Sequence, residues 1–371
     1  MKCICSQKDL KEALIAASKA LPTKPQTPIL NNIYFCATQN TLEIQATDFS
    51  TGIIAKIPAE VEIEGEVVIP GKKITEIIGK MFGAIITLST EEEENLAVIK
   101  SGTTTFSLYT SDSEEFPKVA TQEYNHSFYI KNEYLKQLIA RSTFATANDT
   151  TRPIFQGCSI TINGSDITFV ATNTHRLILA KSTIEDEIPG ENKLIVHATA
   201  LNDVLSILNA TKDERGVKVD FSDKHIAFTI NNIFLTCRLI DGEFPPHDKV
   251  FPASCATFAS VPISKFLSEM SLVETVSRET EYNTVRLKFN DEGLALAADS
   301  YGTGKVLGNV NAEVTGPNID IAFNLRYIQD FLKIAEDSEE VRIGMNEPLS
   351  PAEFRFPDKE DIIYVITPVR V

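Results

Sequence analysis

Long apolar runs are missing from this chain of 371 residues. No stretch approaches the roughly 18 consecutive apolar residues that a membrane-spanning helix needs. Residues 1–10 already carry charge and contain no apolar segment of the secretory type. We therefore expect a cytoplasmic protein that does not contact a membrane. With 43% hydrophobic and 23% charged residues, the chain has the composition of a folded protein with a sizeable core.

Patterns of catalytic or metal-binding residues are also missing. The six cysteines lack zinc-ligand spacing, and neither H-E-x-x-H nor G-x-S-x-G occurs. Gly302-Thr303-Gly304-Lys305 resembles the end of a phosphate-binding loop, but Val306 stands where Ser or Thr would hold magnesium. We expect the cysteines to be small core residues in a reducing compartment. We predict no catalytic residue, no metal and no cofactor.

Positive charge is scarce, since 35 Lys and Arg stand against 51 Asp and Glu, for a formal net charge of −16. Such a balance argues against nonspecific binding to nucleic acid through a basic surface. The acid is concentrated in residues 91–94, 112–115 and 336–340. We interpret these runs as solvated surface, because they lack the ligand spacing of a calcium loop.

One amphipathic pattern, in contrast, occurs six times in the chain. In residues 10–17 the apolar positions are i, i+3, i+4 and i+7, which form one face of a helix. The pattern returns at intervals of 61 to 66 residues, and only its third copy ends on a polar residue, Ser142. The six copies are residues 10–17, 74–81, 135–142, 201–208, 263–270 and 328–335. Near-equal spacing of six such helices predicts a repeat architecture.

The predicted helices differ in charge from the rest of the chain. With their flanking residues they hold 13 Lys and Arg against 9 Asp and Glu, so an acidic chain is basic on its repeated helices. The windows counted are residues 6–23, 71–83, 131–144, 198–212, 264–274 and 325–336. Lysine is also common in helices because of its helix propensity, and charge alone leaves that explanation open.

Segments rich in β-branched and aromatic residues follow each helix and predict antiparallel strands. In residues 104–110, Phe106 and Leu108 alternate with polar residues, as in a half-buried strand. Longer motifs return after two helices: Ala46-Thr47-Asp48 as Ala171-Thr172-Asn173, and Glu115-Phe116-Pro117 as Glu243-Phe244-Pro245. We predict three tandem α+β domains, each with two helices packed on antiparallel sheets. Their predicted bounds are residues 1–122, 127–251 and 254–371.

Several motifs in the right order resemble the bacterial sliding clamp, the DNA polymerase III beta subunit. Residues 171–177 read Ala-Thr-Asn-Thr-His-Arg-Leu and look like the A-T-D-G-H-R-L signature of that family, with Asn173 for Asp and Thr174 for Gly. Residues 1–11 resemble its opening strand and helix, and residues 25–32 its first loop. The ending Tyr-Val-Ile-Thr-Pro-Val-Arg-Val resembles its tail. The resemblance covers essentially the whole chain.

The resemblance implies a non-enzymatic ring, in which two chains join head to tail around double-stranded DNA. Helices pack about 10 Å apart, so six in a circle leave a hole of roughly 9 Å and twelve a hole of roughly 28 Å. A duplex is roughly 20 Å wide, so one chain cannot close around it and a homodimer can. By the same resemblance, Lys24, Lys72, Lys73, Asn148 and Arg152 face the DNA.

A second implied site is a hydrophobic pocket that binds a short peptide. The family places it between the second and third domains, where it serves the replicative polymerase catalytic subunit, the clamp loader and other proteins with a clamp-binding motif. The apolar tail of the chain supports such a wall independently. The implied residues are Phe155, Thr172, Thr174, His175, Arg176, Leu177, Pro245, Val250, Val365, Thr367, Pro368, Val369 and Arg370.

For the dimer interface we expect the strand with Phe106 and Leu108 to meet the region of Leu272 and Val276 on a second chain. Two other functions remain open from the sequence. One is a repeat scaffold that binds proteins without encircling DNA, and the other is an enzyme with a dispersed catalytic site.

Overall fold

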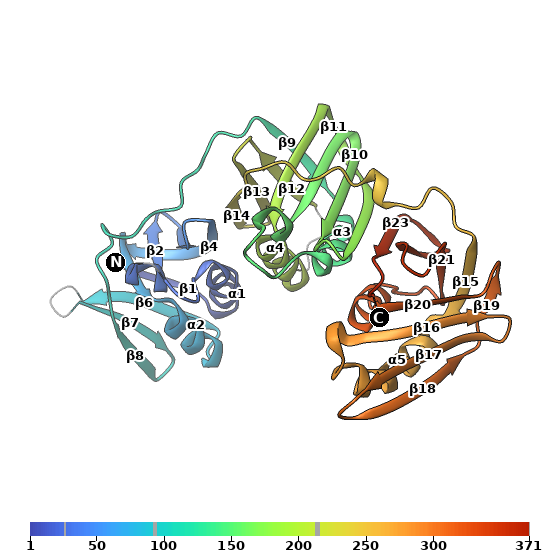
Figure 1. Cartoon of the computed structure of the whole chain (residues 1–371). Helices are drawn as coiled ribbons and strands as arrows, with labels where there is room; N and C mark the ends of the chain where they lie inside the picture. The colour runs from blue at the N-terminus through green and yellow to red at the C-terminus, as the bar shows by residue number, and fades with distance from the viewer. Residues whose placement is uncertain (26, 92–94, 212–215, 371) are drawn as a thin grey trace. The chain divides into compact units, whose positions relative to one another are not determined.

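The computed structural model describes residues 1–25, 27–91, 95–211 and 216–370 (Figure 1). Most of the predicted acidic run at 91–94 and the terminal Val371 therefore lie outside the described residues.

The described residues form six α-helices, one at each predicted window, which confirms the helical repeat. They are α1 (Gln7–Ala17), α2 (Gly71–Lys80), α3 (Asn132–Ser142), α4 (Ala198–Ala210), α5 (Ile263–Ser277) and α6 (Leu325–Leu332). The four positions of the pattern are buried in each copy, Ser142 included, except that Leu205 and Leu267 are half-buried. None of the described helices has the length and apolar character that crossing a membrane would require.

Local signals explain where several helices begin. The Ser6 hydroxyl accepts a hydrogen bond from the Asp9 backbone N–H at 3.4 Å and caps α1, and Asn324 caps α6 by accepting from Arg326 N–H at 3.0 Å. At α2 and α5 a proline, Pro70 or Pro262, stands at the N-cap. The preceding strand therefore ends where the helix begins.

The chain packs as two compact units. One consists of Met1–Leu135, Ile184–Ile188 and Thr199–Leu239, and the other of Lys136–Thr183, Pro189–Ala198 and Ile240–Val371. The middle of the chain thus contributes to both units.

In the first unit the described strands form one antiparallel sheet in the order β8-β7-β6-β1-β4-β14-β13-β12-β9, with β2, β3 and β5 branching from β4. Helix α1 packs on β4 and against α2 (Figure 1). The strands are β1 (Lys2–Ser6), β2 (Asn32–Thr38), β3 (Thr41–Thr47), β4 (Thr51–Ile63), β5 (Gly65–Pro70), β6 (Ile85–Glu91), β7 (Leu96–Ser101), β8 (Thr104–Tyr109), β9 (His126–Ile130), β12 (Val217–Phe221), β13 (His225–Ile230) and β14 (Ile233–Arg238).

In the second unit one sheet runs β10-β11-β23-β22-β21-β15-β19 and another runs β18-β17-β16-β20. Helix α5 packs on β17 and β18 and against α6. The strands are β10 (Gly157–Thr172), β11 (Arg176–His197), β15 (Thr257–Pro262), β16 (Thr284–Asn290), β17 (Gly293–Ser300), β18 (Gly304–Val310), β19 (Glu313–Thr315), β20 (Ile319–Asn324), β21 (Glu340–Met345), β22 (Ala352–Phe356) and β23 (Lys359–Ile366).

Strands from different repeats are joined in the same way twice. In the first unit β4 pairs with β14 from Thr51↔Cys237 to Ala55↔Ile233, and in the second β11 pairs with β23 from Arg176↔Ile366 to Ala180↔Ile362. Both junctions are antiparallel and begin at the first residue of the earlier strand. Each domain thus contributes a strand edge with which a strand of the next domain pairs. Free edges are then left in the first and the last domain.

Strands β8 and β18 are two such edges, each lying at the end of its sheet. The prediction that β8 is half-buried is wrong for the single chain. Phe106 is 39% exposed, and every other residue of the strand except the half-buried Leu108 is exposed. The alternation in the sequence is real, but within the described chain no layer covers the apolar side of this strand.

Candidate functional site

The loop between β10 and β11, residues 173–175, forms a hairpin that is closed by side chains within it and beside it. The Thr172 hydroxyl donates to the Arg176 carbonyl at 2.7 Å and accepts from Thr174 N–H at 3.0 Å. The Asn173 side-chain oxygen accepts from the backbone N–H groups of His175 and Arg176, both at 3.1 Å. Asparagine replaces the expected aspartate without loss, because these bonds need only an acceptor oxygen.

Thr174 occupies the position of the expected glycine, and its backbone has a φ of 76°. This is the left-handed region, which a β-branched residue rarely adopts. The hairpin therefore keeps the backbone shape suited to glycine and holds a threonine in it.

Arg176 ties this hairpin to helix α6. Its guanidinium donates to Asp330 at 2.8 Å and to the Phe144 carbonyl, and it lies over the rings of Phe144 and Tyr327. The Arg176 side chain is 8% exposed, whereas that of Asp330 is 31% exposed, so the arginine is buried and its partner is partly in contact with water. Arg176 acts mainly as a structural tie, although part of it borders the cavity described next.

A cavity of about 170 Å³ opens beside the hairpin in the second unit. Its walls are apolar and aromatic, and the ring of Phe244 stands edge-on to Phe155 at 6.0 Å between centroids. Nine predicted pocket residues line it: Phe155, Thr172, Thr174, Arg176, Leu177, Pro245, Val250, Val365 and Thr367.

Three lining residues were missed by the sequence reasoning: Phe244, Pro246 and His247. Phe244 belongs to the Glu-Phe-Pro motif that occurs twice in the sequence, and this repetition is the signal that could have indicated it. His247 stacks edge-on between Phe244 and Phe251, so the loop after this motif forms an aromatic wall.

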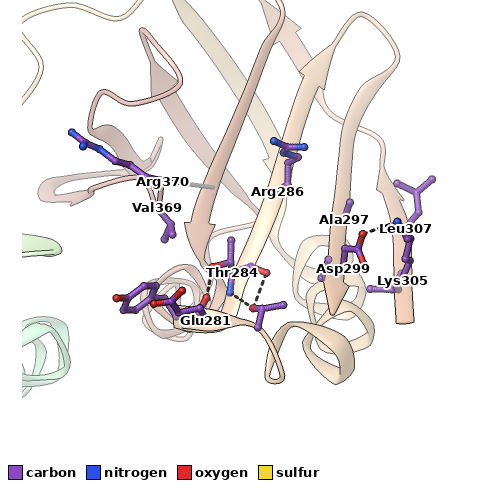
Figure 2. Close-up of a pocket in the computed structure, with 13 residues that line it drawn as sticks. Glu281, Thr284, Arg286, Ala297, Asp299, Lys305, Leu307, Val369 and Arg370 are labelled. Atoms are coloured by element: carbon purple, nitrogen blue, oxygen red, sulfur yellow. Dashed lines mark hydrogen bonds and ion pairs between the residues drawn. The ribbon is translucent and has the colours of Figure 1, made fainter. Parts of the chain in front are cut away.

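Four predicted pocket residues lie outside this cavity: His175, Pro368, Val369 and Arg370. Val369 N–H donates to the Ala322 carbonyl at 2.7 Å and fixes the tail along β20. Val369 and Arg370 instead border a larger groove of about 690 Å³ on the sheet of β16, β17 and β18. Figure 2 shows Arg286, Ala297 and Leu307 on neighbouring strands of this groove, with the tail residues nearby.

The predicted DNA-facing residues Lys24, Lys72, Lys73, Asn148 and Arg152 are all exposed. Lys73 makes an ion pair with Glu76 at 3.2 Å, and the same carboxylate accepts from Lys80 at 2.7 Å. These two lysines hold the pKa of Glu76 below its usual value, and the hydrogen bond from Lys80 is the largest single cause. Three of the predicted residues lie in the first unit, whereas Asn148 and Arg152 lie in the second.

The predicted dimer residues fall into exposed and buried groups. Phe106 and Leu108 border a groove of about 800 Å³ with the fully exposed ring of Phe82, which the sequence reasoning missed. In the third domain Leu272 is 58% exposed, whereas Val276 is 8% exposed and buried within that domain. Val276 therefore does not offer the contact surface expected of it.

Three family models match consecutive parts of the chain. They describe the N-terminal, central and C-terminal domains of the DNA polymerase III beta subunit and match residues 1–120, 129–246 and 248–370. The chain belongs to the DNA polymerase III beta subunit family, the bacterial sliding clamps. Its three clamp domains and α+β class are as predicted, and the family is non-catalytic.

Full-length relatives agree. The beta sliding clamp of Bacillus subtilis is 27% identical over 98% of each chain, and that of Staphylococcus epidermidis is 28% identical over 95% of this chain and 94% of the relative. The solved Bacillus subtilis clamp superposes with a TM-score of 0.93 at 26% identity, covering 100% of this chain and 99% of its own. The Thermotoga maritima beta subunit superposes with a TM-score of 0.94 at 26% identity, with the same coverage.

Proposed function

We propose that this sliding clamp closes as a head-to-tail homodimer around double-stranded DNA and keeps the replicative polymerase on its template. The observation that carries the proposal is the pair of sheet edges β8 and β18, one in the first clamp domain and one in the third. Each edge has exposed apolar side chains beside it, Phe82 and Phe106 for β8 and Leu272 and Leu307 for β18. Pairing the first domain of one chain with the third of another would cover both edges. We propose domain bounds of residues 1–122, 127–251 and 254–371.

The clamp would hold DNA by enclosure and not by tight contact. Exposed lysines such as Lys24, Lys72 and Lys73 give a weak positive potential that keeps the duplex centred, while the overall acidic charge repels DNA elsewhere. Few phosphate contacts imply a shallow dependence of binding on salt, and the absence of base contacts lets the clamp slide.

The cavity beside Thr172 and Leu177 is the proposed docking site for partner proteins. It is concave and mostly apolar, which suits a short hydrophobic peptide from the polymerase catalytic subunit, the clamp loader or another client. Thr367 is exposed at its rim, so an arginine there should fill the entrance without disturbing the core. Thr367→Arg should weaken client-peptide binding at least tenfold by fluorescence anisotropy, whereas Leu349→Asp, at an exposed position outside the cavity, should not.

Loading on closed and open DNA tests enclosure directly. After loading by the cognate ATP-driven loader, the protein should remain on nicked circular plasmid through gel filtration and should slide off the same plasmid after linearisation. Equal retention on both forms would contradict enclosure and indicate an ordinary DNA binder. Retention on neither, with client peptides still bound, would favour a protein scaffold that does not encircle DNA.

A further inference from the structure

The segment that follows the last strand of each clamp domain makes the same backbone hydrogen bond. In each case an N–H of the segment donates to the carbonyl of the residue three positions before a helix, α2, α4 or α6. The donors and acceptors are Ser111 and Val68 at 3.0 Å, Ile240 and Ile195 at 2.8 Å, and Val369 and Ala322 at 2.7 Å. The three segments therefore leave their domains from equivalent points.

In the first two domains the segment goes on to cover the sheet with an aromatic side chain. Phe116 stacks on Tyr34 in the first domain, with ring centroids 5.5 Å apart. In the second domain Phe244 packs on a buried cluster of strand residues, which are Val170, Leu177 and Leu179. An aromatic ring is thus the anchor of the covering segment in both domains.

In the third domain the corresponding face of the sheet is open. After Val369 the described chain contains only Arg370, and the groove of about 690 Å³ lies beside these two residues. Its floor includes Arg286, Ala297 and Leu307, which pair with one another across β16, β17 and β18. Figure 2 shows Arg286 between the tail and the other two side chains. Leu307 is 70% exposed and the Arg286 side chain 58%, so the described chain leaves this row uncovered.

An exposed aromatic ring borders the groove. Tyr282 stands two residues before its strand β16, as Phe155 stands before β10 and Leu30 before β2. Leu30 and Phe155 are 2% and 8% exposed, whereas Tyr282 is 63% exposed. The third domain therefore presents to solvent a side chain that the other two domains bury.

The groove also carries more positive than negative charge, in a chain whose net charge is −16. Three cations and two acids border it: Arg286, Lys305, Arg370, Glu281 and Asp299. Asp299 already pairs with Lys305 at 2.7 Å. Arg286 pairs with Asp320 at 3.2 Å, but both side chains are exposed, so this ion pair is weak and leaves the guanidinium available to another carboxylate.

The covering segments of the first two domains have the opposite charge. They read Asp-Ser-Glu-Glu-Phe-Pro at residues 112–117 and Asp-Gly-Glu-Phe-Pro at residues 241–245, so acidic residues come directly before the aromatic anchor. A segment of this kind would complement the groove of the third domain in shape and in charge.

We propose that this groove is a further docking site for partner proteins, and that it binds an extended segment in which acidic residues precede an aromatic residue and a proline. The aromatic ring packs against Tyr282, Val369 and Leu307, and the acidic residues meet Arg286 and Arg370. The site goes beyond the proposed function, because it does not use the cavity beside the β10–β11 hairpin and is formed by one chain.

The site is compatible with the proposed ring. At the first domain junction a Cβ on Gly52 would lie 2.6 Å from Val119 of the covering segment and 3.4 Å from Thr236 of the paired strand β14. A covering segment and a strand of the next domain thus lie together on one strand. An occupied groove in the third domain therefore leaves the edge of β18 free to pair.

The probe for this site is a synthetic peptide of residues 241–247 with Trp in place of Phe244. The chain contains no tryptophan, so the emission comes from the peptide alone and moves to shorter wavelength when the indole leaves water. We expect a saturable shift with one peptide bound per chain. Binding should be at least tenfold weaker for a peptide with Lys in place of both Asp241 and Glu243, because their charge would then match that of the groove.

Variants of the full chain locate the probe. Ala297→Glu should weaken binding at least tenfold and Arg286→Ala at least fivefold. Lys288→Ala is the matched control for Arg286→Ala, because Lys288 is also exposed and lies two residues further along β16, outside the groove. Thr367→Arg, which blocks the other cavity, should leave probe binding unchanged. Absence of saturable binding, its loss in Thr367→Arg, or equal effects of Arg286→Ala and Lys288→Ala would each overturn the proposal.

Discussion

At the scale of single residues, Thr174 is held in a backbone conformation that costs about 1–3 kcal/mol for a side chain of its type. Thr174→Gly removes this strain but adds freedom to the unfolded chain, so we expect a net gain of about 1 kcal/mol in unfolding free energy. Chemical denaturation measures it.

A position of the same backbone type serves as the control. Gly164 has a φ of 61°, and a Cβ added there would meet no atom within 4 Å, so Gly164→Ala introduces strain without a clash. It should destabilise by about 1 kcal/mol. If Thr174→Gly destabilised to the same extent, the strain assigned to Thr174 would be wrong.

Asp203 shows how the two domain junctions differ in charge. Asp203 is the sixth residue of α4, and Asp330 is the sixth residue of α6. Asp330 makes an ion pair with Arg176. At the first junction, the counterpart of Arg176 is Thr51, which carries no charge. Burial, with a smaller contribution from the Asp48 carboxylate, raises the pKa of Asp203 to about 6, although Lys19 opposes the shift.

A raised carboxyl pKa destabilises the folded state once the unfolded chain loses its proton. The penalty is absent below about pH 4, grows between pH 4 and 6, and is complete above pH 6. Asp203→Asn should therefore stabilise the protein by about 1 kcal/mol at pH 8, after allowance for solvent screening, and have no effect near pH 4. Thermal unfolding across this range measures the effect, and Asp330→Asn should destabilise at pH 8. A stabilisation by Asp203→Asn that did not change with pH would contradict the assignment.

At the scale of elements, the sequence predicted what depends on periodic burial. The six helices follow from apolar residues spaced 3.6 apart, and most of their faces are buried as expected. The wall formed by Phe244, Pro246 and His247 could not be predicted in this way, because it belongs to a loop without a repeating pattern. The ion pair of Arg176 could not be predicted either, because its partner Asp330 is 154 residues away in the sequence. Nothing local to Arg176 indicates that its charge is buried.

Strand β8 illustrates a pattern that the single chain does not explain. Its alternation predicts a buried face, yet Phe106 and the neighbouring Phe82 are exposed. An apolar strand edge left uncovered is a site for association. The alternation in β8 therefore indicates a face that a second chain would cover. The prediction of a half-buried strand failed because a single chain does not supply that cover.

At the scale of the whole molecule, the proposed ring depends on two identical interfaces, so each chain uses both of its edges. A charge at Phe106 on the first domain or at Leu272 on the third would be buried without a partner when the ring closes. Phe106→Asp and Leu272→Asp should each raise the dimer dissociation constant by two orders of magnitude or more, as measured by analytical ultracentrifugation. Leu349→Asp is the matched control, because Leu349 is 62% exposed, compared with 58% for Leu272, and lies outside the proposed interface.

Each interface mutant should keep its client-peptide affinity, since the cavity belongs to one chain, but lose retention on circular DNA. A mutant that stayed dimeric at nanomolar concentration would contradict the proposed interface, and loss of peptide binding would indicate damage to the fold instead.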